Sequence, residues 1–185
     1  MASMNYYGAK ELAASFRTVR GNTLKIAEEI PEDKYGYRPA EGTKTVSEQL
    51  THIALSARFN EQIHFVEKRT SMEGFDFMKF MGGLGAEQAK PRSKAEVIAL
   101  LKEEGEKFAK RLESLSDDFL GQSVTMPPGA HPPARTRFDM LASVKEHEMH
   151  HRGQLMLVER MLGITPHLTR EQQARMAAMQ AANQR

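Results

Sequence analysis

The sequence contains no cysteine in its 185 residues. The chain can therefore form neither a disulfide nor a thiolate metal site, and a bound metal must be held by histidine, aspartate or glutamate. No apolar run approaches the roughly 20 residues that span a bilayer, and the start, MASMNYYGAKELAAS, lacks the segments of a signal peptide. We therefore expect a cytoplasmic protein without a membrane partner.

Blocks of like charge are also missing. The 26 lysines and arginines are interleaved with 24 aspartates and glutamates, which gives a net charge of +2. There is no basic stripe and no RNA-binding signature, so we expect no nucleic-acid partner. The length predicts a single domain, 1–185, with a core over about 5–166 and a C-terminal tail over 167–185.

Four stretches repeat apolar residues every three or four positions, which is the helical period, and none alternates convincingly like a strand. They cover about 5–30, 45–69, 93–112 and 136–162. Thr45 with Glu48, and Ser93 with Glu96, have the spacing of a capping box. Gly163 is a normal stop after the last helix.

Two long connections separate these stretches. Residues 70–92 contain four glycines and Pro91, and we expect a loop long enough to make the second and third helices parallel. Residues 123–137, SVTMPPGAHPPARTR, contain four prolines and are expected to be irregular. The pattern predicts an all-α fold, a four-helix bundle with long crossover connections.

The last helical stretch contains the segment VKEHEMHHRGQLMLVER, with His147, His150 and His151. His147 and His151 are four residues apart on the stripe predicted to be buried, so their side chains point the same way. Unpartnered polar groups in a core cost about 1–3 kcal/mol each, and a shared metal would satisfy both imidazoles. His150 lies about 100° around the helix from His151, so we do not expect it to join them.

A third ligand must come from another helix, and His52 lies in the apolar arc of the second one, LTHIALSARFN. The alternative for His52 is a hydrogen-bonded core residue. His64 is about three turns further along and too distant. His131 and His167 are expected to be exposed. Three imidazoles would leave open positions on zinc, nickel or iron(II), as in catalytic sites.

The segment HEMHH also matches H-E-x-x-H, the pattern of zinc peptidases. Such enzymes need a further ligand downstream. The next acidic residue, Glu159, is eight positions along the same helix from His151, more than about 10 Å away. The sequence also offers no strand to hold an extended peptide, so we do not expect a peptidase.

The combination of LTHIA in the second helix and HEMHHRGQL in the fourth resembles the DinB family of metal-binding helical bundles. The resemblance covers about 5–166, because two further segments are also similar to that family: IPEDKYGYRPAEGTKTVSEQLTHIA and VERMLGITP. It implies an up-down-down-up bundle, a metal site formed by His52, His147 and His151, and a homodimer. Relatives of this fold include transferases and isomerases that use a low-molecular-weight thiol, although many members have no established reaction.

An open metal position could activate water for hydrolysis or bind an exogenous thiol as thiolate. We expect a metal-dependent enzyme with a small-molecule substrate, a thiol-dependent transferase or a related enzyme, with no catalytic residue assigned. The alternatives are a non-catalytic metal-binding stress-response dimer, a metal-dependent hydrolase, or histidines that serve only the core. Three further residues are candidates for hydrogen bonds to the ligands or to bound solvent: Gln154, Glu148 and Glu48.

Overall fold

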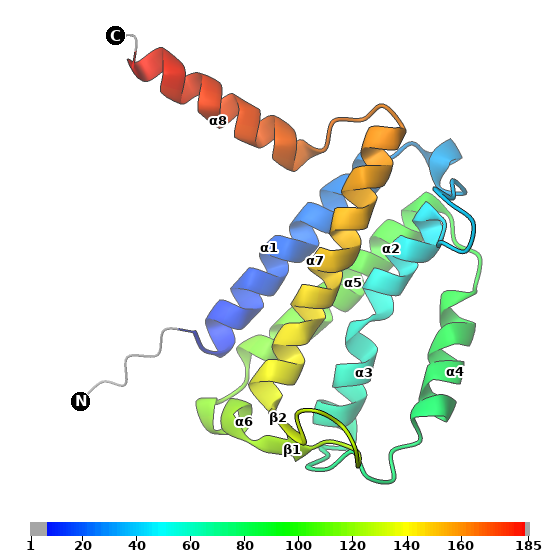
Figure 1. Cartoon of the computed structure of the whole chain (residues 1–185), viewed down its shortest axis with the longest axis vertical. Helices are drawn as coiled ribbons and strands as arrows, with labels where there is room; N and C mark the ends of the chain where they lie inside the picture. Colours follow the sequence, from blue (N-terminus) through cyan, green and yellow to red (C-terminus); the bar gives the residue numbers. More distant parts are fainter. Residues whose placement is uncertain (1–6, 184–185) are drawn as a thin grey trace.

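A computed structural model describes residues 7–183. Its body is a bundle of four helical rods (Figure 1). These rods are α1 (Ala9–Glu29), α2 (Val46–Leu55) continued by α3 (Ala57–Glu61), α5 (Lys94–Glu113) and α7 (Arg137–Met161). In Figure 1, α1 and α7 run upward while α2–α3 and α5 run downward. The predicted all-α, up-down-down-up bundle is thereby confirmed. The expected helix start near Asn5 lies outside the described residues.

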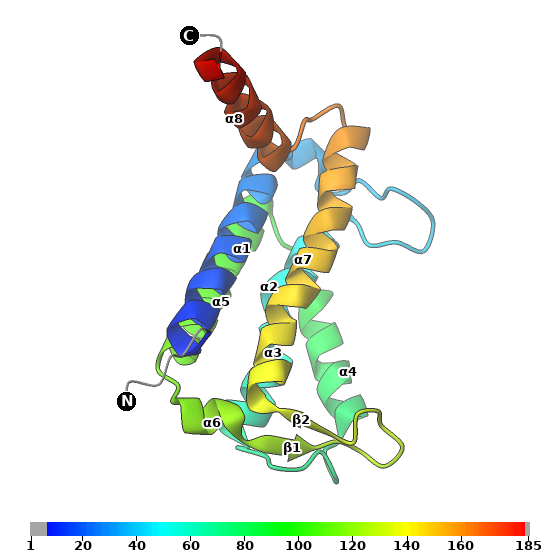
Figure 2. The same cartoon turned by 60° about the vertical axis from the view of Figure 1, so that its left-hand side comes forward.

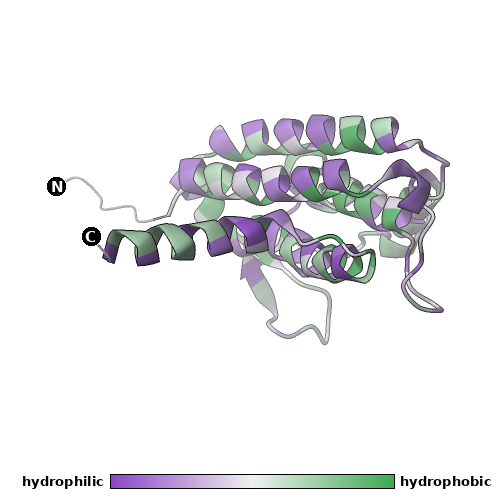
Figure 3. Cartoon of the chain, turned by 90° about the horizontal axis from the view of Figure 1, so that it is seen from above, coloured by the Kyte–Doolittle hydropathy of each residue, from purple (hydrophilic) through white to green (hydrophobic). Residues whose placement is uncertain are grey.

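Each rod packs on two others: α1 and α2 both contact α5 and α7. All of them carry hydrophobic and hydrophilic residues side by side, as Figure 3 shows. The predicted capping boxes at Thr45 and Ser93 are present, and α7 ends two residues before Gly163, whose φ is +78°. No helix among residues 7–183 is long and apolar enough to cross a membrane.

The second rod is interrupted, although the sequence predicted one continuous helix. α2 ends at Leu55, and after α3 the chain forms a π-helical segment, Gln62–Val66. Ser56 lies at the first interruption, where its hydroxyl donates to the carbonyl of Ile53 at 2.9 Å. Such local side-chain bonds compete with the helical ladder and bend helices.

The Gly-rich connection contains a helix, which corrects the prediction of a loop over 70–92. α4 (Phe77–Gln88) begins after Asp76, whose side chain accepts from the backbone nitrogen of Lys79 at 2.9 Å. Leu84 is the one buried residue of α4, so this helix lies outside the bundle beside α2 (Figure 1). Glycines weaken the helical signal in the sequence, which is why the periodicity missed α4.

The Pro-rich connection is also more regular than predicted. A short helix, α6 (Asp117–Gly121), precedes a hairpin of β1 (Ser123–Thr125) and β2 (Ala134–Thr136). The strands are antiparallel, with Val124 opposite Arg135. The four prolines fall in the loop between the strands, where missing N–H groups do not interrupt the pairing.

Helix α8 (His167–Asn183) follows the bundle and projects away from it (Figures 1 and 2). Its first residue, His167, was expected to be exposed, but only 3% of its surface is accessible. Its Nε2 lies 3.3 Å from Oδ1 of Asn22 in α1. The sequence gives no sign of this burial, because it depends on where the chain turns after Gly163.

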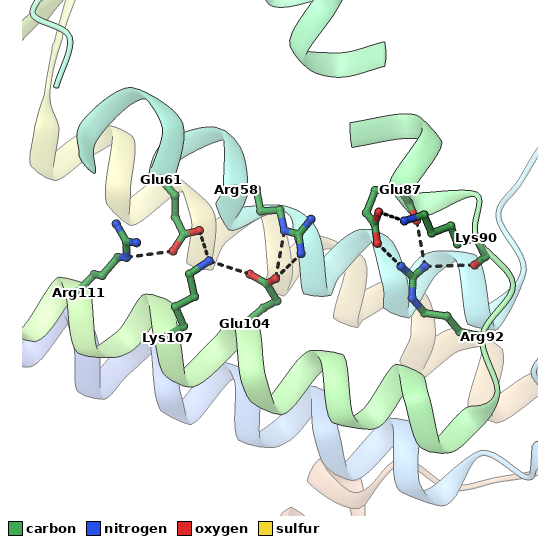
Figure 4. A network of polar contacts seen from close by, with 8 residues as sticks. All are labelled: Arg58, Glu61, Glu87, Lys90, Arg92, Glu104, Lys107 and Arg111. Atoms are coloured by element: carbon green, nitrogen blue, oxygen red, sulfur yellow. Dashed lines mark hydrogen bonds and ion pairs between the residues drawn. The ribbon is translucent and has the colours of Figure 1, made fainter. Parts of the chain in front are cut away.

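A chain of charged residues connects α3 and α5 (Figure 4). Arg58 binds Glu104, and Lys107 joins Glu104 to Glu61, which also pairs with Arg111. A second group fastens the end of α4: Arg92 donates to the side chain of Glu87 at 2.6 Å and to its carbonyl at 3.0 Å. This contact fixes the position of Gln88, the last residue of α4.

Three apolar clusters form the core, and a polar layer separates the two larger ones. On α1 the clusters contain Phe16 and Ile26, and Arg20 lies between these residues. On α7 they contain Val144 and Leu155, and Glu148 lies between them. The three histidines of interest occupy the same level of α2 and α7, so the fold places them at mid-bundle.

Candidate metal centre

His52, His147 and His151 bring one ring nitrogen each to a common point, all within 4.8 Å of one another. Nε2 of His147 lies 3.1 Å from Nε2 of His52 and 3.1 Å from Nε2 of His151. All three side chains are partly buried. The structure therefore brings together the three residues that the sequence analysis proposed as ligands.

The positions of these residues along α2 and α7 bring their side chains together. His147 and His151 are one turn apart on the inward side of α7. His52 is in the last turn of α2 and faces them across the α2–α7 contact. A carbonyl next to His52, that of Ile53, accepts from Nη2 of the buried Arg20 at 3.4 Å. The ligand-bearing part of α2 is thus tied to the polar layer of the core.

Glutamine side chains contact the outer nitrogens of two rings. Nδ1 of His52 lies 3.2 Å from Oε1 of Gln88. Because a carbonyl oxygen only accepts, Nδ1 of His52 carries the hydrogen and its Nε2 presents a lone pair. Nδ1 of His151 contacts two amides, Oε1 of Gln154 at 2.9 Å and Nε2 of Gln49 at 2.5 Å. A divalent cation at the common point would bind the Nε2 atoms of all three neutral rings, so these residues fit a metal.

Electrostatics also favour the neutral, ligating form of the rings. Burial, together with the neighbouring His151 and His52, lowers the pKa of His147 from 6.5 to about 4. Burial likewise lowers the pKa of His52 and of His151. Nδ1 of His147 is buried and has no hydrogen-bond partner among the described residues. This ring is held by packing, whereas the other two are oriented by amides.

Of the three predicted supporting residues, only Gln154 contacts the cluster. Glu148 is fully buried, but its carboxylate accepts from Arg20 at 2.9–3.1 Å. The carboxylate of Glu48 accepts from the backbone nitrogen of Thr45 at 2.7 Å and pairs with Arg38. Both carboxylates thus have structural partners of their own.

The sequence analysis missed two amides. Gln88 reaches His52 from α4, and Gln49 donates to Oε1 of Gln154 at 2.7 Å. Gln49 is one turn before His52 on α2, so helical spacing was an available signal for it. Gln88 offered none, because α4 itself was not predicted.

The other histidines lie elsewhere in the described structure. His150 is exposed, with Nε2 3.2 Å from Nε2 of Gln154. His131 is exposed, as predicted. His64 is buried and its Nδ1 lies 2.9 Å from Nη1 of Arg137; burial and this arginine lower its pKa to about 4. None of these residues belongs to the cluster of three.

Two cavities reach the cluster from different sides. The first, here the α4 cavity, measures about 250 Å³ and has His52, His147 and Gln88 in its wall. The second, here the α7 groove, measures about 550 Å³ and has Lys44 and His151 in its wall. A larger space of about 830 Å³ between α3, α4 and α5 contains none of the three histidines and is lined by the paired charges of Figure 4.

Known proteins are similar to this chain in sequence and fold. The model of the DinB superfamily matches residues 15–155. The chain is 26% identical to YjoA of Bacillus subtilis (strain 168) over 157 residues, 85% of this chain and 92% of YjoA. The crystal structure of YjoA, a DinB-like protein, is similar with a TM-score of 0.62 at 24% identity, covering 84% of this chain and 93% of YjoA.

A second solved structure is that of YfiT from Bacillus subtilis, described as a probable metal-dependent hydrolase with an unusual four-helix bundle topology. It matches with a TM-score of 0.65 at 17% identity, over 89% of this chain and 93% of YfiT. At such identity the likeness concerns the fold. Since the superfamily model spans most of the chain, from α1 to α7, the protein belongs to the DinB superfamily.

Proposed function

We propose that this protein is a divalent-metal-dependent enzyme that transfers a low-molecular-weight thiol to a small electrophilic substrate. One observation carries the proposal: three imidazole Nε2 atoms converge, and no carboxylate of the described chain joins them as a fourth ligand. Three protein ligands with an open position are typical of catalytic rather than structural sites. His52, His147 and His151 would hold zinc, nickel or iron(II), all of which accept imidazole.

The ion would supply Lewis-acid chemistry, because it lowers the pKa of a thiol or water at the open position. The protein's own residues keep the rings neutral and fixed. Gln88 holds the hydrogen on Nδ1 of His52, and Gln49 and Gln154 both contact Nδ1 of His151. The apolar walls of the α4 cavity limit the water that competes with the substrate.

Thiol transfer is favoured over hydrolysis because the carboxylates that lie near the ligands in the sequence are already bound to other residues. Activation of water commonly uses a general base within hydrogen-bond reach. Glu148 is bound by Arg20, and Glu48 is bound in the cap of α2. A thiolate needs no base once it has lost its proton, and the chain has no cysteine that would compete with an added thiol.

Hydrolysis is the second candidate, and the description of YfiT as a probable metal-dependent hydrolase favours it. The same three histidines would serve, with water in the place of the thiol. A non-catalytic metal-binding bundle is the third possibility. It would bind metal but show no turnover with any thiol and electrophile pair.

The test is a transfer assay with bacillithiol, mycothiol or glutathione and 1-chloro-2,4-dinitrobenzene. In this reaction a carbon–sulfur bond forms, the carbon–chlorine bond breaks, and the thiol proton goes to the solvent. We expect turnover with zinc-, nickel- or iron-loaded protein, loss of turnover in His147→Ala, and retention in His150→Ala. Ester or amide cleavage without thiol transfer would instead support the hydrolase, and metal binding without turnover would support the non-catalytic bundle.

The predicted homodimer is part of the same proposal. Its support is the family resemblance together with exposed apolar side chains on α7 and α8: Leu157, Met161, Met176 and Met179. Sedimentation equilibrium of the full chain would give the mass directly. A monomer mass at the concentrations of the transfer assay would remove the dimer from the account.

A further inference from the structure

The α4 cavity has an apolar lining beside two of the three candidate ligands. Its wall contains Phe59, Phe77, Met81, Leu84 and Val144 in addition to His52 and His147. Phe59 packs against Phe77 with ring centroids 5.9 Å apart, which holds the outer edge of the cavity together. Any group bound there would lie against the imidazoles whose Nε2 atoms face the common point.

The volume of this cavity limits what it can hold. A cavity of about 150 Å³ lined by apolar side chains accepts benzene. The α4 cavity measures about 250 Å³, so it has room for one six-membered ring and a few further atoms. It is smaller than the roughly 300–1,000 Å³ of drug-sized pockets. A peptide-sized group would not fit.

Two buried polar atoms in this wall lack a hydrogen-bond partner among the described residues, Nδ1 of His147 and Oδ1 of Asn60. Asn60 is only 7% exposed and its Oδ1 has no hydrogen bond in the described structure. The two serines of the wall differ from it, because Ser56 donates to Ile53 and Ser143 donates to the carbonyl of Met140 at 2.6 Å. A buried amide without a partner costs free energy unless a ligand or water completes its bonding.

The α7 groove offers no comparable group. Its two amides, the buried Gln49 and the exposed Gln154, bind each other and His151. Its remaining polar groups lie on the exposed loop before α2, which bulges outward in Figure 2. Two imidazoles and an unused carboxamide therefore distinguish the α4 cavity.

We propose that the α4 cavity binds the substrate, through a single aromatic or branched aliphatic group that carries a hydroxyl or amide, and that the Asn60 carboxamide recognises this polar group. The inference rests on the proposed function, since it names the substrate class of the same metal centre. The bound group lies against His52 and His147, and the rest of the substrate extends toward the common point of the ligands. Asn60 is a specificity residue and takes no part in bond breaking.

The first test needs no mutation, and it compares metal-free with zinc-loaded protein. Phenol and toluene have the same shape, but only phenol offers a hydroxyl. The protein is labelled with ¹³C at its methionine methyl groups, and each compound is titrated in turn into metal-free and zinc-loaded samples. Met81 lies in the wall of the α4 cavity and Met161 lies in the wall of the α7 groove. We expect both compounds to shift the Met81 signal and to leave the Met161 signal unchanged.

Variants then test the cavity and the amide separately. Met81→Trp fills the α4 cavity and should weaken phenol binding at least about tenfold, whereas Met161→Trp, the matched change in the α7 groove, should leave it unchanged. Met81 is 36% exposed, so the larger ring can be accommodated at the surface. Asn60→Leu should reduce the preference for phenol over toluene about fivefold, which corresponds to one neutral hydrogen bond. Circular dichroism confirms that each variant is folded.

The outcomes separate this inference from the proposed function. A shift of the Met161 signal instead of Met81, no binding of either compound, or an unchanged phenol preference in Asn60→Leu would each overturn it. Phenol binding is also measured without metal. A protein that binds phenol at Met81 but never binds metal would support the binding cavity and contradict the proposed enzyme. Metal binding and thiol transfer without any phenol binding would support the proposed enzyme and contradict the substrate role of the α4 cavity.

Discussion

Arg20 and Glu148 form a fully buried ion pair at the level of the candidate metal ligands. Nε of Arg20 donates to Oε1 of Glu148 at 3.0 Å and Nη2 donates to Oε2 at 2.9 Å. The same guanidinium donates to the carbonyls of Leu101 and Ile53, so one side chain connects all four rods of the bundle. Glu148 follows His147, and Ile53 follows His52. The pair therefore fixes the relative position of the two helices that carry the ligands.

The first prediction concerns the energy of this pair. Arg20→Met should lower the free energy of unfolding by about 3–5 kcal/mol, because it leaves the Glu148 carboxylate buried without compensation. Arg17→Met is the matched control on the same helix, since Arg17 pairs with Glu106 and Glu113 at the surface and should cost about 1 kcal/mol or less. Urea unfolding measures both. Equal losses in the two variants would contradict the structural role of Arg20.

A second prediction compares two helical glycines. A methyl group at Gly105 would lie 2.9 Å from both Cγ and Nη1 of Arg20, so Gly105→Ala should destabilise the protein by about 1–3 kcal/mol. A methyl group at Gly21 would meet nothing within 4 Å, so Gly21→Ala should stabilise it by about 0.5–1 kcal/mol through helix propensity. Thermal unfolding should move the two midpoints in opposite directions, and a shared direction would argue against this packing.

The third prediction is a pH dependence at Glu159, which is fully buried with neither carboxylate oxygen hydrogen-bonded in the described chain. Burial, with a smaller effect of Glu29, raises the pKa of Glu159 from 4.5 to about 7. Between these values the folded protein holds a proton that the unfolded chain releases. The unfolding free energy therefore falls as pH rises through this window, by up to about 3 kcal/mol, and the contribution is constant above it.

Glu159→Gln removes this titration while it keeps the shape of the side chain. Relative to the wild type, the variant should be more stable at pH 8 and should lose that advantage as the pH approaches 5. Urea unfolding across this range, with the difference between the two proteins plotted against pH, isolates the contribution from other groups such as His64. A difference that stays flat would show that Glu159 is not desolvated.

A fourth prediction addresses the amides behind the rings. Gln88→Leu removes the acceptor at Nδ1 of His52 and should weaken metal affinity about 10- to 100-fold, the usual effect of losing such a partner. Gln62→Leu is the control, because Gln62 donates to Glu67 at the surface. Competition with a chromophoric chelator gives both affinities. Unchanged binding in Gln88→Leu would mean that α4 does not support the site.

The sequence predicted the features that depend on local periodicity. The helical repeats and capping boxes located the four rods, and the i, i+4 spacing of His147 and His151 placed both rings on one face of α7. His52 was proposed because a histidine within an apolar arc needs a partner. In the structure its Nε2 is 3.1 Å from that of His147.

Contacts between distant segments could not be predicted in this way. Arg20 and Glu148 are 128 positions apart, and nothing in the spacing of either helix indicates the other. Gln88 was missed because glycines obscured α4, and His167 because its burial depends on the turn after α7. Glu148 was proposed to support the ligands because it follows His147 in the sequence, but its carboxylate is bound by Arg20 of α1.

The central claim is that His52, His147 and His151 bind one divalent ion. Elemental mass spectrometry of tag-free protein, in the wild type and in His52→Ala, His147→Ala, His151→Ala and His150→Ala, tests it most directly. We expect about one equivalent of zinc, nickel or iron in the wild type and in His150→Ala, and a loss of the metal in the other three variants. A wild type that stays metal-free after reloading, or metal retained in all three variants, would contradict the account.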